Sequence, residues 1–75
     1  MAQNILGIDL GGTKVFAAVF DETGAILGKS RNKTEAERGD TAVFETIVST
    51  GLDAIKESGL NVTDIAGVGI GSPGP

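Results

Sequence analysis

Two short apolar runs lie on either side of a glycine pair, and this arrangement restricts the possible folds more than any other feature of the sequence. Asn4–Leu10 is almost continuously apolar, which predicts a strand buried on both faces. Residues 15–20, VFAAVF, fit both helical and strand spacing. Their short length, their β-branched and aromatic content and the DETG that follows favour a strand. Gly11 and Gly12 are then expected to form the turn of a β-hairpin.

Residues 25–39 predict a third strand followed by a connecting loop. Residues 25–31, AILGKSR, begin after DETG and are polar only towards their far end, so we expect a strand. Three short strands joined by tight turns form an antiparallel meander. Residues 33–39, KTEAERG, are mostly polar and charged and are expected to be a loop.

An amphipathic helix is the most clearly patterned element of the chain. Asp40 or Thr41 has the side chain of an N-cap residue, and Gly59 suits the left-handed position after the last turn. Lys56 lies in that last turn, where a cation complements the helix dipole. Apolar residues recur at spacings of three and four on one face of this helix: Phe44, Ile47, Val48, Leu52 and Ile55.

A fourth strand is expected after the helix. Following a turn at residues 61–64, Ile65–Gly71 alternates apolar residues with glycines, whose side of the strand allows close packing. A helix between the third and fourth strands makes a crossover connection. The expected fold is therefore α/β, in the order strand, strand, strand, helix, strand, with one parallel pair in a mixed sheet.

The composition excludes several classes of function. The 75-residue chain has no cysteine and no histidine, which rules out disulfides, thiolate metal sites and the usual acid–base side chain at neutral pH. Its net charge of −4 and its lack of Trp and Tyr argue against a nucleic-acid partner. No stretch approaches the roughly 18 apolar residues of a membrane span, and the start of the chain lacks the basic region of a signal peptide. A cytoplasmic protein without a membrane partner is expected.

The stretch GIDLGGTKV places an acidic residue directly before the glycine pair. It nearly spells a P-loop, but Thr13 and Lys14 are in reversed order and a strand follows instead of a helix. A hairpin turn can also bind phosphate, because glycine amides at positive φ form an anion-binding concavity, to which Thr13 adds a hydroxyl and Lys14 a charge. Asp9 would repel phosphate unless Mg²⁺ lay between them. The alternative is a plain hairpin with a solvated acid and a solvated lysine, and the local sequence leaves both interpretations open.

A second glycine cluster closes the sequence. Residues 69–74, GIGSPG, match GxGxxG formally, but Pro73 within the match makes a dinucleotide fingerprint a weak interpretation. A rigid turn is the simpler one, unless the fold places this segment beside the first glycine turn.

Together, GIDLGGTK and the later GVGIGSPGP resemble the ROK family of sugar kinases and sugar-responsive repressors, which belongs to the actin-like ATPase superfamily with its ribonuclease H-like fold. The resemblance implies that Asp9 holds Mg²⁺ through water. It further implies two loops, one around the outer phosphates of ATP and one shaping the sugar cleft. The first contains Gly11, Gly12, Thr13 and Lys14, and the second contains Gly71, Ser72, Pro73 and Gly74 and ends at Pro75.

The same resemblance implies ATP-dependent phosphorylation of a hexose hydroxyl by a cytoplasmic homo-oligomer. ATP, Mg²⁺ and a sugar would be its ligands. Residues 1–75 would be the N-terminal part of the first, small lobe, without the rest of that lobe or the second lobe. The aspartate base and the zinc ligands of such enzymes would lie after Pro75, so zinc could bind only outside these residues. The fragment alone is expected to be inactive, because phosphoryl transfer depends on positioning by many groups.

Three alternatives are kept. A sugar-responsive repressor of the same family would need a DNA-binding domain before the first strand, for which residues 1–4 leave no room. An actin-like chaperone or filament protein would turn over ATP without sugar, although GGTK and GSPGP are more similar to the sugar kinases. A stand-alone binding module is disfavoured by an exposed apolar helix face and open sheet edges.

Overall fold

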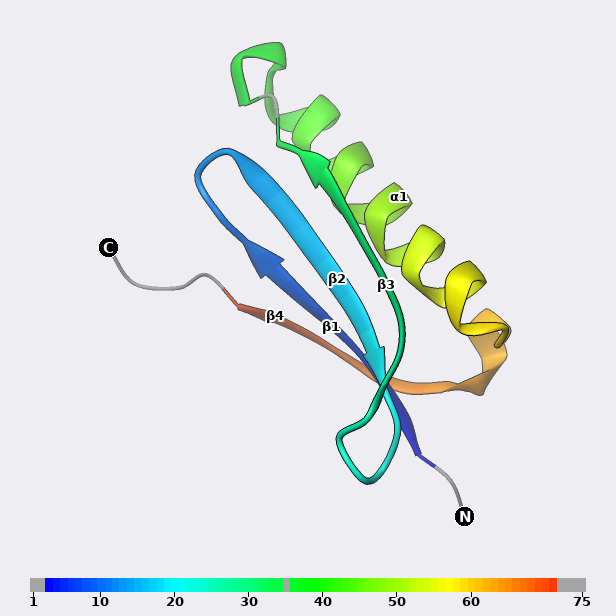
Figure 1. The fold of residues 1–75 in the computed structure, drawn as a ribbon. Helices are drawn as coiled ribbons and strands as arrows, with labels where there is room; N and C mark the ends of the chain where they lie inside the picture. The colour runs from blue at the N-terminus through cyan, green and yellow to red at the C-terminus, as the bar shows by residue number, and fades with distance from the viewer. Residues whose placement is uncertain (1–2, 35, 72–75) are drawn as a thin grey trace.

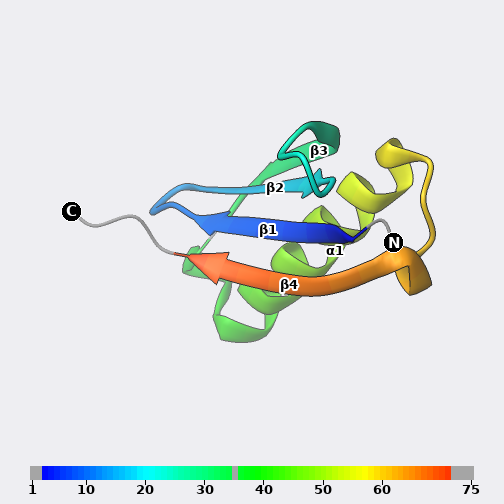
Figure 2. The same cartoon turned by 90° about the horizontal axis from the view of Figure 1, so that it is seen from below.

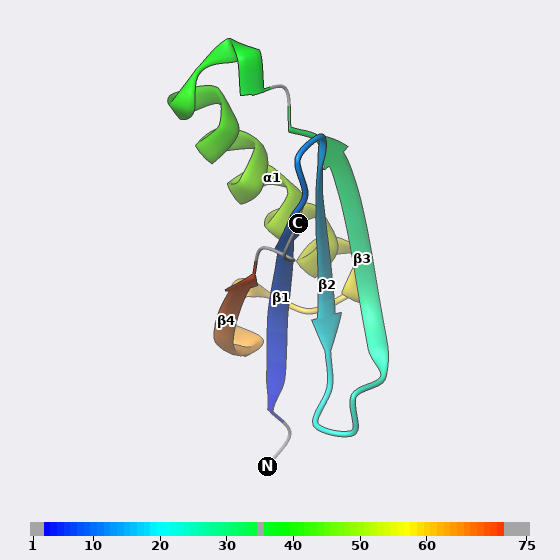
Figure 3. The ribbon, with the colours of Figure 1, turned by 90° about the vertical axis from the view of Figure 1, so that its left-hand side faces the viewer.

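The computed structural model describes residues 3–34 and 36–71, which form one four-stranded sheet with a long helix on one face (Figure 1). Figure 3 shows the strand order β3-β2-β1-β4. The first three strands pair antiparallel, and β4 runs parallel to β1. The predicted meander and parallel pair are confirmed, although β3 extends further than residues 25–31. The strands are β1 (Asn4–Leu10), β2 (Lys14–Phe20), β3 (Ile26–Lys33) and β4 (Ile65–Gly71).

Helix α1 (Asp40–Ser58) connects β3 to β4, as predicted. The predicted N-cap at Asp40 or Thr41 is wrong: Gly39 precedes the helix with a φ of 99° and makes no side-chain capping bond. Asp40 lies in the first turn instead, where the helix dipole favours its carboxylate. Gly59 follows the helix in the left-handed conformation, as expected. In the described part of the chain, no helix is both long enough and apolar enough to span a membrane.

Two short 3-10 helices lie at the ends of α1. The first, η1 (Ala36–Arg38), falls inside the predicted loop at residues 33–39, whose first residue Lys33 belongs to β3. The second, η2 (Val62–Asp64), falls in the predicted turn before β4. There the backbone N–H of Asn61 donates to Asp64 Oδ2 at 2.8 Å.

The hydrophobic core lies between α1 and one face of the sheet. In β1, Leu6 and Ile8 are buried, whereas Ile5 is 39% exposed and Asp9 is exposed. The prediction that this strand is buried on both faces is therefore wrong, because within the described residues α1 covers one face. The core cluster consists of Leu6, Ile8, Val15, Ala17, Val19, Ala54 and Ile55.

Helix α1 packs on β3 and β2 through small and hydrogen-bonded residues. A Cβ added at Gly28 would overlap the backbone of Ala54 and Ser58, so the helix touches the bare backbone of β3. Further along, Thr50 accepts a hydrogen bond from Asn32 Nδ2 at 2.7 Å. These contacts hold α1 over the β3 side of the sheet.

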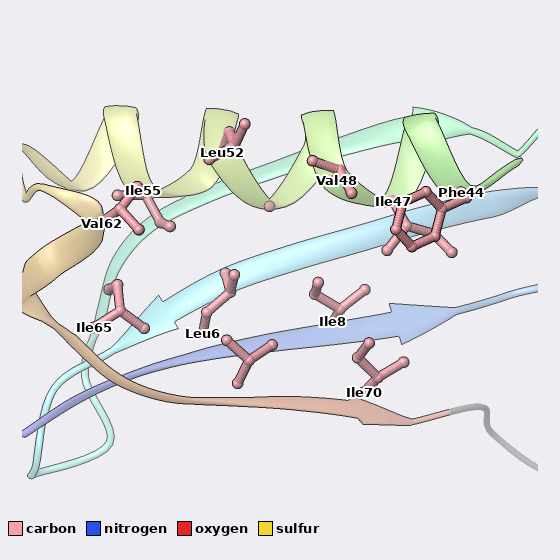
Figure 4. Close-up of a pocket in the computed structure, with 12 residues that line it drawn as sticks. Leu6, Ile8, Phe44, Ile47, Val48, Leu52, Ile55, Val62, Ile65 and Ile70 are labelled. Carbon is pink, nitrogen blue, oxygen red and sulfur yellow. The ribbon is translucent and has the colours of Figure 1, made fainter. Parts of the chain in front are cut away.

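An apolar groove of about 370 Å³ consequently remains open between α1 and β4 (Figure 4). Leu6 and Ile8 lie at its floor, and Phe44 on its helix side is 65% exposed. The predicted apolar stripe of α1 is thus only partly buried: Ile55 is in the core, but three members border the groove as exposed residues. These three are Phe44, Val48 and Leu52, and β4 contributes Val68 and Ile70 opposite them.

Candidate functional site

The turn between β1 and β2 is held in place by hydrogen bonds from both sides. Within the turn, the backbone N–H of Gly11 donates to the carbonyl oxygen of Lys14 at 2.8 Å. From the segment after β3, the backbone N–H of Thr34 donates to the carbonyl oxygen of Thr13, also at 2.8 Å. The Thr34 hydroxyl lies 3.5 Å from the carbonyl oxygen of Gly11. The turn is therefore anchored before any ligand binds.

This anchored turn presents unused hydrogen-bond donors. The backbone N–H groups of Gly12 and Thr13, and the Thr13 hydroxyl, have no partner within residues 3–34 and 36–71. Both residues are exposed. Adjacent free amides in a fixed turn can both donate hydrogen bonds to an anion such as phosphate.

Neither glycine of the pair has an unusual backbone conformation, and of the two only Gly11 is closely approached by another part of the described chain. The expectation of positive φ at Gly11 and Gly12 is wrong: among the described residues, glycines at 24, 39 and 59 have positive φ, and these two do not. A Cβ at Gly11 would lie 3.1 Å from the Lys14 carbonyl oxygen, whereas a Cβ at Gly12 would meet no protein atom within 4 Å. The described chain itself thus does not require a glycine at residue 12, and the space beside this residue is open.

Asp9 lies at the end of β1 next to this turn, exposed on the face opposite α1. Its carboxylate has no hydrogen bond or ion pair in the described part of the chain. Because it is exposed, an acid in this apolar run carries no large desolvation cost. No cluster of three metal-ligating side chains forms among residues 3–34 and 36–71. A single free carboxylate nevertheless fits Mg²⁺, which keeps several waters and takes its other ligands from phosphate oxygens.

The fold brings the described part of the second glycine cluster, at the end of β4, beside the β1–β2 turn. Gly71, the last residue of β4, pairs with Asp9 across the parallel strands β4 and β1. Figure 2 shows the β1–β2 turn and the C-terminal end of β4 at the same end of the sheet. Gly71 therefore lies beside the first glycine turn, and a shared site formed by the two glycine clusters stays a prediction. The other predicted members of the sugar-cleft loop, Ser72, Pro73, Gly74 and Pro75, lie outside the described residues.

Lys14 is exposed as the first residue of β2, and the β2–β3 register places Lys33 directly opposite it. Sequence reasoning did not single out Lys33, Arg31 or Thr34. The cations at residues 29, 31 and 33 could have indicated a row of positive charge, because alternate residues of a strand point to the same face. Only the register shows which of them lies nearest the turn.

Comparison with known proteins decides the family. The ROK family model matches residues 5–75, nearly the whole chain. The chain belongs to the ROK family. The resemblance seen in GIDLGGTK and GVGIGSPGP is therefore confirmed.

Relatives of this ROK-family chain include kinases. It is 35% identical over 78 residues to a glycerol kinase of Rhizobium meliloti (strain 1021), a match that covers 93% of the chain and 16% of that kinase. Its structure is similar to a ROK family glucokinase from Streptomyces griseus in complex with glucose and AMPPNP. The TM-score is 0.78 with 31% identity, over 95% of this chain and 20% of the glucokinase. The chain thus spans about a fifth or less of the length of these two kinases.

The four strands and α1 match the start of an actin-like ATPase fold, and the domain is incomplete. A reductive activator for corrinoid,iron-sulfur protein has a similar structure, with a TM-score of 0.79 and 23% identity, over 93% of this chain and 15% of that protein. At that level of identity the likeness shows the fold alone. The predicted fold class is confirmed.

Proposed function

We propose that the protein carrying this chain transfers the γ-phosphoryl group of ATP to a hydroxyl of a hexose. The observation that carries the proposal is the β1–β2 turn, which offers free amides at Gly12 and Thr13, open space at Gly12 and a free carboxylate at Asp9 beside it. Family membership supports it, as does the likeness to a glucokinase bound to glucose and AMPPNP. Residues 1–75 would form the N-terminal part of the first lobe.

Each residue of the turn has a separate part in this proposal. The N–H groups of Gly12 and Thr13 and the Thr13 hydroxyl donate to the outer phosphate oxygens, and Lys14 supplies positive charge. Asp9 orients the waters around Mg²⁺, which when bound neutralises charge on the phosphate tail. Asp9 does not remove the proton of the acceptor hydroxyl; a base elsewhere in the protein has that part.

The acceptor side of the site begins at Gly71. Because Gly71 is paired with Asp9, the chain that leaves β4 starts beside the phosphate turn. The proposal assigns the acceptor cleft to the loop of Gly71, Ser72, Pro73 and Gly74. A cytoplasmic location, a homo-oligomeric state and zinc ligands outside residues 1–75 remain predictions from the sequence.

Glycerol is a second candidate acceptor, favoured by the 35% identity to a glycerol kinase. The family resemblance also keeps a sugar-responsive repressor and a sugar-independent ATPase as alternatives. A repressor would bind sugar without releasing ADP. An ATPase of the actin-like type would release ADP at the same rate with and without an acceptor.

The test is release of ADP by the polypeptide as its natural host produces it, with Mg²⁺, ATP and a panel of hexoses and glycerol. Asp9→Asn should lower kcat/KM for ATP by about 10- to 100-fold, because residues that act on a metal through water have effects of this size. Glu22→Gln is the control, since it removes the same charge from an exposed residue in the turn between β2 and β3, at the other end of β2 from the β1–β2 turn. Unchanged turnover in Asp9→Asn would contradict the role proposed for Asp9.

A further inference from the structure

Four of the six Lys and Arg residues of this acidic chain lie on the sheet face opposite α1. Val15, Ala17 and Val19 of β2 are buried in the core, so Lys14, Phe16 and Ala18 point the other way. The β2–β3 register pairs these with three cations on β3: Lys14 with Lys33, Phe16 with Arg31, and Ala18 with Lys29.

The cations nearest the turn carry charge that the described chain does not neutralise. Lys14, Arg31 and Lys33 form no ion pair within residues 3–34 and 36–71. The acids of α1 that border β3 do not change this: Asp53 shares a hollow with Lys33, and Glu57 shares one with Arg31, but no ion pair forms. Like charges directly opposite each other on neighbouring strands are destabilising, and Lys14 and Lys33 are such a pair.

These side chains also border a common space close to the phosphate turn. Lys14, Arg31, Asn32 and Lys33 line a hollow of about 200 Å³. Thr34, which follows Lys33, is bonded through its N–H to Thr13 of the turn, so the end of β3 is fixed beside the free amides. Adjacent strands lie about 4.8 Å apart, which places Lys33 within one strand spacing of Lys14.

We propose that Lys33 and Arg31 of β3, together with Lys14, bind the phosphate tail of the nucleotide held at the β1–β2 turn; this rests on the function proposed above. A negative ligand offsets the repulsion between Lys14 and Lys33. The planar fork of Arg31 can bind two phosphate oxygens at once. The β3 cations thus extend the phosphate site beyond the GGTK motif, onto a strand that the motif does not include.

A competing explanation is that cations on an edge strand only prevent it from pairing with another sheet. β3 is one of the two edge strands of the described sheet, and Lys29 belongs to the same row of cations on it. Lys29 lies furthest from the turn of the three β3 cations, opposite Ala18. If the cations only protect the edge, replacing Lys29, Arg31 or Lys33 should have the same effect on ADP affinity. If they bind phosphate, replacing Lys29 should leave ADP affinity nearly unchanged.

The experiment measures affinities by calorimetry on the polypeptide as its natural host produces it. The ligands are ADP with Mg²⁺, adenosine, and a hexose phosphate. Lys33→Gln and Arg31→Gln should each weaken ADP binding by about three- to fivefold, the size expected of exposed charge pairs. Lys29→Gln, the matched control, should change it by less than about twofold. Adenosine affinity should be unchanged in all three variants, and added salt should reduce the difference between wild type and Lys33→Gln.

Each of the following outcomes overturns the proposal. If Lys33→Gln weakens ADP binding no more than Lys29→Gln does, edge protection is left as the explanation for these cations. A parallel loss of adenosine affinity would indicate structural damage, which thermal melting of each variant checks. Weaker binding of the hexose phosphate with unchanged ADP binding would assign the cations to the acceptor side. If Asp9→Asn weakens ADP binding while the β3 variants do not, this inference alone fails; if wild type binds no nucleotide, both proposals fail.

Discussion

The backbone N–H of Thr34 donates to the carbonyl oxygen of Thr13 at 2.8 Å, and this bond joins the end of β3 to the turn between β1 and β2. The two residues are far apart in the sequence, yet the bond uses a carbonyl of the turn and leaves the Gly12 and Thr13 amides free. Thr34 is buried and Thr13 is exposed. The turn is thus anchored through the Thr13 carbonyl oxygen, while its free N–H donors belong to exposed residues.

We expect Gly12→Ala to reduce nucleotide affinity without reducing stability. The added methyl meets no protein atom within 4 Å and Gly12 has no positive φ, so the fold tolerates it. Replacing glycine at such a position stabilises a protein by up to about 1 kcal/mol. The methyl occupies the space assigned to phosphate, and ADP affinity should fall at least about tenfold, the equivalent of 1.4 kcal/mol. Calorimetry and a thermal melt measure the two effects separately.

Gly11→Ala is the contrasting variant for this prediction. Its Cβ would lie 3.1 Å from the Lys14 carbonyl oxygen, so the turn must shift. It should lose stability and nucleotide affinity together. If Gly12→Ala binds ADP as tightly as wild type does, the phosphate does not lie against residue 12.

Gly28→Ala should destabilise the protein because it pushes α1 away from β3. The new Cβ would overlap backbone atoms of Ala54 and Ser58, which cannot move aside as a flexible side chain would. Overpacking of this kind costs about 1–3 kcal/mol. Gly67→Ala is the matched control, since its Cβ would make an ordinary 3.5 Å contact with Ile5. Urea unfolding of both variants should show a lower midpoint in Gly28→Ala alone.

Thr50→Val should cost about 1 kcal/mol through the loss of a hydrogen bond between α1 and β3. Thr50 is fully buried, accepts from Asn32 Nδ2 at 2.7 Å and donates to the Thr46 carbonyl oxygen at 2.6 Å. Valine keeps the shape but removes both bonds. A double-mutant cycle with Asn32→Ala isolates the inter-element bond, and we expect a coupling of about 0.5–1 kcal/mol. Additive effects would show that this bond does not stabilise the packing of α1 on β3.

Much of the fold follows from local sequence patterns, but which face of a strand or helix is buried does not. The helix, its end at Gly59, the hairpin and the order of the elements along the chain were all predictable, because spacing and turn residues are local properties. The burial of β1 was not, since apolar residues on both of its sides look alike until α1 is seen to cover Leu6 and Ile8 and not Ile5. The groove beside Phe44 could not be predicted either, because it also depends on the position of α1, which tight packing at Gly28 draws towards β3.

The candidate site, too, could be predicted only in part. Asp9, Gly12 and Thr13 were identifiable because one short motif contains them all. The reason for the glycines was not identifiable, because a close contact and a positive φ each lead to a glycine in the sequence. The neighbourhood of Lys14 and Lys33 depends on the β2–β3 register, which includes an irregularity between Val19 and Phe20. A bulge moves partners by one residue and cannot be placed from spacing alone.

The turn between β2 and β3 should lose stability in acid because of Asp21. Its Oδ1 accepts hydrogen bonds from the Thr23 hydroxyl at 2.6 Å, the Thr23 N–H at 2.8 Å and the Ala25 N–H at 3.0 Å. These bonds, led by that of the Thr23 hydroxyl, favour the charged form and hold the pKa of Asp21 below its ordinary value of 3.8. A lowered pKa stabilises the folded state above pH 3.8, and this contribution disappears as pH falls through the lower folded-state pKa. An NMR titration of the Asp21 carboxyl measures the shift directly. Thr23→Ala removes the leading donor and should raise the pKa of Asp21 towards 3.8, whereas an unchanged titration in that variant would show that the Thr23 hydroxyl does not cause the shift.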